Sequence, residues 1–301
     1  MQTLYVLASM EPGEMEISKK SGSHILDDKL NRSLDLFLVS VLYTMRIAQY
    51  AETDALQRSS KYLPTEEDKH VSTKISSNEF VLQVLSDKAF QERIKNAHLE
   101  QYIDAEWVKK IHQQLSKTPE YKQYTDTAGN TQAAEKDIIR FIWEKEMLGN
   151  EELQNTFNEE LPGWEDDKEM IVMLMGNLFS SSTKANFANL ISAEKREYAH
   201  ALLHTVIDKE DYCMELINPK LKNWDTDRVA LIDLFLLRMG VCEFIYFPTI
   251  PTKVTINEYI EIAKLYSTPQ SGQFVNGVLD NILKDLEKEN LVRKQERNRK
   301  S

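Results

Sequence analysis

The pattern of apolar residues predicts one helix after another along this chain. Apolar residues recur at intervals of three and four, which places them on one face of an α-helix. Pro, Gly and short polar runs separate the periodic segments. The predicted helices lie within residues 1–10, 25–60, 78–116, 133–160, 168–179, 194–218, 229–247, 255–266 and 274–286, and the predicted loops include 116–132 and 267–272.

The longest apolar stretch runs from Val229 to Phe247, and Asp233, Arg238 and Glu243 interrupt it. Charges at these intervals argue against a membrane span and favour a helix that is buried in protein.

Several polar residues and one glycine in the last third of the chain have predicted structural roles. These are a cap at Asp225 or Thr226, a capping box of Thr255 and Glu258, bonds from Asn257 and Asn276 to backbone, and close helix packing at Gly277.

Gly and Pro are scarce, with 9 and 8 in 301 residues. Folds made of many short strands need turns rich in these residues, so a β-sandwich, a barrel or a Gly-rich nucleotide-binding fold is excluded. The two cysteines are too few for a disulfide scaffold or a zinc site built from cysteine. We therefore expect an all-α protein, and the lack of a secretory leader predicts a cytoplasmic location.

The net charge of −11 argues against nucleic-acid binding by the whole surface. The acidity is uneven, since residues 1–193 hold 21 Lys and Arg against 31 Asp and Glu, whereas residues 194–301 hold 16 against 17. The basic run from Arg293 to Lys300 is expected to be a solvated tail.

Three groups of residues have the chemistry of metal ligands or nucleophiles. His200 and His204 share one helix face, but no third ligand is evident. Glu165–Asp167 offers oxygen ligands, but an acidic helix start explains this run. Cys213 and Cys242 have no nearby histidine in the sequence and are expected to be buried. No motif of an enzyme is present, so we predict neither catalysis nor a metal or cofactor.

Three strings in the C-terminal third resemble the NusB family of transcription antitermination factors. They are Asp-Arg-Val-Ala-Leu-Ile-Asp (227–233) followed by Leu-Arg-Met-Gly (237–240), Pro-Thr-Lys-Val-Thr-Ile-Asn-Glu (251–258), and Ser-Gly-Gln-Phe-Val-Asn-Gly-Val-Leu-Asp (271–280). The likeness covers residues 194–287, and Gln2-Thr3-Leu4-Tyr5 resembles part of the family's first helix.

The resemblance implies an organisation of the chain. A NusB-like helical-bundle core would combine residues 1–9 with 194–290, and residues 291–301 would form a basic tail. Residues 10–193 resemble the long insertion of the enlarged NusB proteins of the Bacteroidetes, and we expect them to be an acidic helical insertion without an assigned role.

The resemblance also implies a function. Proteins of this family bind the boxA element of nascent ribosomal RNA transcripts together with the ribosomal protein NusE, and the pair joins RNA polymerase and suppresses termination. Two rivals remain open: a protein-interaction scaffold that does not bind RNA, and a metal-dependent helical enzyme that uses Glu165–Asp167 or the His200/His204 pair.

The chain departs from the family pattern at its two basic RNA-contacting positions. The family's Arg-rich segment would lie before Gln2, whereas the first basic residue here is Lys19, so we expect that residues precede the given start. Gln273 stands where many relatives have Lys or Arg before the Phe of the last helix; it can form hydrogen bonds but adds no charge.

The resemblance places the RNA-binding site in the loop from Tyr266 to Gln273. Tyr266 can stack an unpaired base or close the helix against the core. Ser271 can contact RNA or cap the last helix, and we favour the cap. Tyr5 can approach RNA or pack in the core. Arg228 and Arg238 are expected to pair with acidic residues rather than contact RNA. The predicted RNA-binding residues are Tyr5, Tyr266, Ser267, Thr268, Gln270, Ser271, Gln273 and Phe274.

Overall fold

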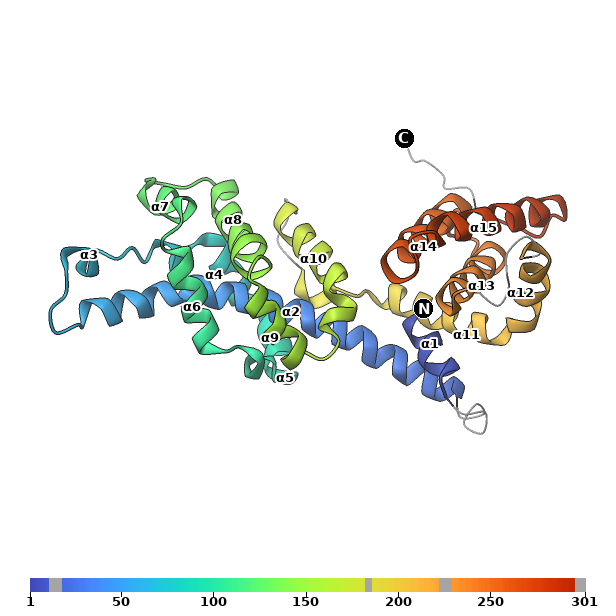
Figure 1. The fold of residues 1–301 in the computed structure, drawn as a ribbon, viewed down its shortest axis with the longest axis horizontal. Coiled ribbons are helices and arrows are strands. Elements are labelled where there is room, and N and C mark those ends of the chain that lie inside the picture. The colour runs from blue at the N-terminus through green and yellow to red at the C-terminus, as the bar shows by residue number, and fades with distance from the viewer. Residues whose placement is uncertain (11–17, 182–185, 222–228, 296–301) are drawn as a thin grey trace. The chain divides into compact units, whose positions relative to one another are not determined.

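A computed structural model describes residues 1–10, 18–181, 186–221 and 229–295, and these form helices without any β-strand (Figure 1). The all-α prediction is therefore confirmed. The chain divides into two compact units: a terminal unit of Met1–Lys29 with Ile191–Ser301, and a central unit of Leu30–Leu190. None of the helices in the described ranges has the length and apolar character needed to cross a membrane.

The terminal unit is built around one buried helix, α13, because α11, α12, α14 and α15 all pack against it (Figure 1). Apolar side chains on every side of α13 are buried, among them Leu236, Leu237, Val241 and Phe244. The prediction of a helix buried in protein is thus confirmed. The elements of this unit are α1 (Gln2–Ala8), the start of α2 (Ser18–Ser59), α11 (Ala193–Asp208), α12 (Glu210–Ile217), η6 (Asn218–Lys220), α13 (Leu231–Tyr246), α14 (Thr252–Tyr266) and α15 (Ser271–Lys288).

The three charged residues inside α13 bond to the neighbouring helices. Asp233 accepts a hydrogen bond from Ser271 at the start of α15. Arg238 forms an ion pair of 2.9 Å with Glu210 of α12, as predicted. Glu243 accepts hydrogen bonds from three hydroxyl groups, those of Tyr198 on α11 and of Thr255 and Tyr259 on α14. Buried charges need such partners, so these contacts determine how the helices pack around α13.

Several local predictions for the last helices are wrong. Thr255 lies inside α14 rather than at its start, and its hydroxyl donates to Glu243 instead of forming a capping box. Asn257 and Asn276 are exposed, and a Cβ on Gly277 would meet no atom within 4 Å. Close packing occurs instead at Gly240, whose Cβ would lie 2.7 Å from Leu279 Cδ2. The predicted caps Asp225 and Thr226 lie outside the described residues.

The central unit encloses the middle of α2. Residues 36–45 of α2 are buried all round, whereas the sequence predicted a single apolar stripe. Ser40 and Thr44 fit there because each hydroxyl donates to the carbonyl four residues earlier, at 2.9 and 2.8 Å. The other elements are α3 (Glu66–Lys69), η2 (Lys74–Ser77), α4 (Glu79–Ser86), α5 (Lys88–Asn96), η3 (Leu99–Tyr102), α6 (Ala105–Leu115), α7 (Pro119–Asp126), α8 (Gln132–Phe141), the π-helical η4 (Ile142–Met147), α9 (Glu151–Glu160), α10 (Trp164–Ser180) and η5 (Phe187–Asn189).

Helix α7 lies where the sequence predicted a loop, residues 116–132. Thr118 caps it by accepting from the Tyr121 N–H at 3.2 Å, and Pro119 occupies the first turn, where its missing N–H costs nothing. Tyr121 and Tyr124 are buried. The helix is thus stabilised by tertiary burial of two tyrosines, which a short polar sequence does not reveal.

The boundaries of the compact units differ from the boundaries expected from sequence, residues 10 and 193. Residues up to Lys29 belong to the terminal unit because the start of α2 bonds to α11. Asp27 pairs with Arg196 and with His200, and Ser23 Oγ lies 3.0 Å from His204 Nε2. The helical pattern alone did not reveal this division of α2.

Candidate nucleic-acid interface

The loop between α14 and α15 is organised around the buried hydroxyl group of Ser271. Its Oγ donates to the Asp233 carboxylate at 2.7 Å, because a charged acceptor is the strongest one available. The same oxygen accepts from the Thr268 N–H at 3.2 Å and lies 2.8 and 2.9 Å from the hydroxyl oxygens of Thr268 and Ser267. One serine therefore holds two residues of the loop, Ser267 and Thr268, against α13.

Ser271 does not cap α15 in the way the sequence predicted. It is the first residue of the helix, and the preceding Gln270 provides no side-chain cap. The N–H groups of Gln273 and Phe274 both point to the Gln270 carbonyl, at 3.1 Å each. An uncapped start of an 18-residue helix carries partial positive charge, which favours anions such as phosphate.

The predicted RNA-binding residues of this loop differ in accessibility. Thr268, Gln270 and Gln273 are exposed, and Tyr266 and Ser267 are half-buried. Phe274 is buried in the core with Ser271 and cannot present its ring without a rearrangement. The exposed and half-buried residues present hydroxyl, amide and aromatic groups at the start of α15.

Two residues of this site were not among the predicted ones. The carbon chain of Lys264 crosses Gly272, where a Cβ would lie 3.2 Å from Lys264 Cγ, and its ammonium group pairs with Glu261 at 2.7 Å. Asp233 is buried, and its second oxygen, Oδ1, has no hydrogen-bond partner among the described residues. The sequence signalled Asp233 only as a charge in an apolar run, because its partner lies 38 residues away.

Tyr5 lies on a separate element, α1, which packs against α13. Its side chain is 48% exposed, whereas its neighbours Thr3 and Leu4 are buried. The core-packing interpretation of Tyr5 is therefore wrong, and its ring is accessible to a ligand.

Comparisons with known proteins identify the family. The NusB family profile matches residues 151–284. The transcription antitermination protein NusB of Methylacidiphilum infernorum is 42% identical over 95 residues, 32% of this chain and 66% of that protein. The NusB proteins of Salinibacter ruber (46% over 91 residues; 30% and 57%) and Listeria monocytogenes (42% over 94 residues; 31% and 73%) are similar. This chain belongs to the NusB family. No solved structure matched it significantly.

The likeness to NusB proteins does not extend over whole proteins. The chain spans 57–73% of the length of these three relatives. The family profile begins at residue 151, so it includes α9 and α10 of the central unit as well as the part of the terminal unit from Ile191 to Lys284 in α15. Residues 30–150 have no counterpart in that match.

The residues considered as metal ligands have other partners. His200 pairs with Asp27 at 3.1 Å and His204 bonds to Ser23, so the two rings join α11 to α2. Asp167 is buried and accepts from Ser33 Oγ at 2.6 Å. In the described part of the chain, no three His, Cys, Asp or Glu side chains come together in a way that could hold a metal ion.

Cys213 and Cys242 are buried, as predicted, and both thiols are free. Their sulfur atoms lie 3.5 Å apart where α12 packs against α13. Both residues therefore act as small side chains at a helix contact of the NusB family core.

Proposed function

We propose that this protein is a transcription antitermination factor that binds boxA-type RNA of nascent ribosomal RNA transcripts together with ribosomal protein NusE, and that it acts on elongating RNA polymerase in the cytoplasm. The observation that carries the proposal is the family membership, since the relatives are named transcription antitermination proteins. The family profile covers α11–α14 and most of α15, and so includes the loop at the start of α15.

The proposed RNA contact uses three kinds of group. The start of α15 attracts a backbone phosphate, and Lys264 adds a positive charge beside it. Thr268, Gln270 and Gln273 supply hydrogen bonds, and Tyr266 supplies a ring on which an unpaired base stacks. Ser271 and Phe274, also predicted as RNA contacts, position the loop from beneath.

The proposed function involves binding only, with no catalysis and no cofactor. The surface charge makes a partner important, because an overall charge of −11 repels RNA and the loop offers few cations. NusE would then supply affinity that this chain lacks. The rival interpretation, a scaffold that binds NusE but not RNA, rests on the same acidity.

A fluorescence-anisotropy titration tests the proposal. A boxA-type RNA and a scrambled RNA are titrated with the full chain, with and without NusE, at two salt concentrations. We expect binding that favours boxA and strengthens with NusE. Binding to NusE without a gain in RNA affinity would support the scaffold instead.

A double variant tests the loop itself. Tyr266→Ala with Gln273→Ala is expected to weaken boxA binding about tenfold or more, since one stacked base contributes about 1–3 kcal/mol. Helical content by circular dichroism should stay unchanged. Gln123→Ala, which alters an exposed glutamine of α7 in the central unit, is the control and should bind as the parent does. Unaltered binding by the double variant would show that the loop is not the site.

A further inference from the structure

A pocket of about 320 Å³ lies in the central unit, between the end of α2 and the end of α6. The central unit is acidic, with 18 Lys and Arg against 26 Asp and Glu in residues 30–190. This pocket departs from that balance, because three cationic side chains, two amides and one carboxylate line it. The lining residues are Asp54, Gln57, Arg58, Lys61, Gln113 and Lys117.

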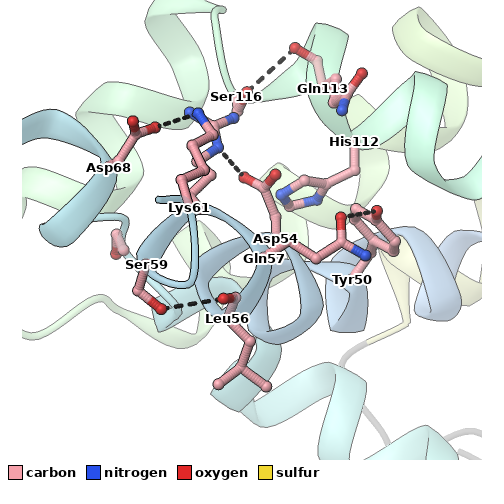
Figure 2. A network of polar contacts seen from close by, with 12 residues as sticks. Tyr50, Asp54, Leu56, Gln57, Ser59, Lys61, Asp68, His112, Gln113 and Ser116 are labelled. Atoms are coloured by element: carbon pink, nitrogen blue, oxygen red, sulfur yellow. Dashed lines mark hydrogen bonds and ion pairs between the residues drawn. The ribbon is translucent and has the colours of Figure 1, made fainter. Parts of the chain in front are cut away.

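The helix ends beside the pocket do not use these cations. A helix C-terminus leaves carbonyl groups without partners, and Lys or Arg often bonds to them. Here hydroxyl groups take that role: Ser60 donates to a carbonyl of α2 and Thr118 to a carbonyl of α6. Ser59 and Ser116 do the same with Leu56 of α2 and Gln113 of α6 (Figure 2). The cationic head groups are therefore not explained by helix capping.

Buried Asp54 forms an ion pair with the guanidinium group of Arg58. The Arg58 Nε lies 2.8 Å from Asp54 Oδ2, and the Asp54 side chain is only 5% exposed. Within the described residues, no hydrogen bond or ion pair engages the two terminal amino groups of Arg58. The contact with Asp54 is an ion pair without hydrogen-bond geometry. The two terminal amino groups form a fork that matches an oxyanion.

The charges around the pocket leave one positive charge without compensation. Asp54 offsets Arg58, and Asp68 offsets Lys61 through a contact of 2.8 Å. The ammonium group of Lys117 has no acidic partner among the described residues. Figure 2 shows the region with Asp54, Lys61 and Gln113 labelled and the His112 ring beside Asp54. Burial lowers the pKa of His112, so this ring is neutral near pH 7 and adds no charge.

We infer that this pocket binds a phosphate group. The Arg58 fork and the Lys117 ammonium supply charge-assisted hydrogen bonds, and the amides of Gln57 and Gln113 can donate to the remaining oxygens. The volume lies at the lower end of the range for small-ligand sites, which suits a phosphate on a small molecule or one phosphate of an RNA backbone. The pocket belongs to the central unit, so its ligand does not depend on the proposed role in antitermination.

The test is a calorimetric titration of the full chain with inorganic phosphate and with adenosine monophosphate in low-salt buffer. We expect saturable binding with one site per chain. Lys117→Gln should weaken it about tenfold, in line with the loss of one charge-assisted hydrogen bond. Arg58→Lys keeps the charge but removes the fork, and it should also weaken binding. Thermal unfolding of both variants checks that the fold is intact.

Lys122→Gln is the matched control. It removes the same charge from an exposed lysine of α7 that does not line the pocket, so phosphate binding should be unchanged. Equal weakening by Lys122→Gln would overturn the inference, because it would show attraction by diffuse charge. A titration without saturation would overturn it as well.

An RNA arm identifies the source of the phosphate. Lower affinity of Lys117→Gln for a boxA-type RNA, with competition by inorganic phosphate, would assign the pocket to the RNA backbone. Unchanged RNA affinity together with lost binding of the small phosphates would assign it to a small ligand. If neither affinity responds to Lys117→Gln, the inference is wrong, whatever the outcome for the loop at the start of α15.

Discussion

At the scale of single residues, buried hydroxyl groups are the recurrent feature of this protein. Burial raises the pKa of Tyr121 and of Tyr124 to about 12 in the central unit. In the terminal unit, burial and the nearby Glu243 carboxylate raise the pKa of Tyr198 and of Tyr259 further. These tyrosines act as hydrogen-bond donors from neutral rings, and each loses that role if it ionises.

The raised pKa values predict that stability falls in alkaline solution. An unfolded chain loses its phenolic protons near pH 10, while folded Tyr121 and Tyr124 keep theirs to about pH 12. The folded state thus binds more protons in this window, so the free energy of unfolding decreases as pH rises above 10. Each tyrosine contributes a slope of up to about 1.4 kcal/mol per pH unit.

Urea unfolding at several pH values between 8 and 11 measures this slope. Tyr121→Phe should reduce it, because one protonation difference is removed. Tyr62→Phe, at a side chain that is 97% exposed, should leave it unchanged. A free energy of unfolding that is constant from pH 10 to 11 would contradict the prediction.

At the scale of elements, the contact between α13 and α15 shows how glycines can have opposite roles in one helix pair. Gly240 of α13 allows Leu279 of α15 to approach its backbone, whereas Gly277 of α15 faces open space. The sequence interpretation assigned the packing role to Gly277. The sequence cannot distinguish the two glycines, because it does not show which residue of the neighbouring helix lies opposite each of them.

Alanine at the two glycines should therefore change stability in opposite directions. Gly240→Ala places a Cβ 2.7 Å from Leu279 Cδ2, so we expect a loss of about 1–3 kcal/mol from overpacking. Gly277→Ala meets nothing and should gain up to about 1 kcal/mol from higher helix propensity. Thermal and denaturant unfolding of both variants measures the two effects. A stabilised Gly240→Ala would show that α13 and α15 are not this close.

At the scale of the whole molecule, charge is unevenly distributed between the two units. Residues 30–190 have a net charge of −8, and the rest of the chain holds 19 Lys and Arg against 22 Asp and Glu. The loop at the start of α15 thus belongs to the less acidic unit. It still has few cations nearby, so phosphate neutralisation by this chain alone should be small.

The affinity of the chain for boxA-type RNA should accordingly depend weakly on salt. One or two neutralised phosphates give a slope of about −1 in a plot of log affinity against log salt, because single strands release about 0.7 counterion per contact. Lys264→Gln should reduce the magnitude of this slope by about 0.7. Lys284→Gln, which alters a similarly paired lysine 13 residues after the start of α15, should not change it. A slope steeper than about −3 would mean that other cations contact the RNA.

The sequence by itself determined the helical class, the burial of α13 and the position of the loop before α15. Period-3.6 spacing and scarce Gly and Pro are local properties, so they can be interpreted without a fold. The strings at 227–280 indicated the family in the same way. Helix α7 and the end of the terminal unit at Lys29 escaped this reasoning, because both depend on partners distant along the chain.

Only the tertiary structure decided how polar groups are paired. Ser271 reaches Asp233 across 38 residues, Lys264 crosses Gly272, and the pocket joins the ends of α2 and α6, which lie more than 50 residues apart. Helical periodicity reports which face is buried but not which residue lies opposite it. A hydroxyl or a cation therefore acquires its role only when packing brings its partner within hydrogen-bonding distance.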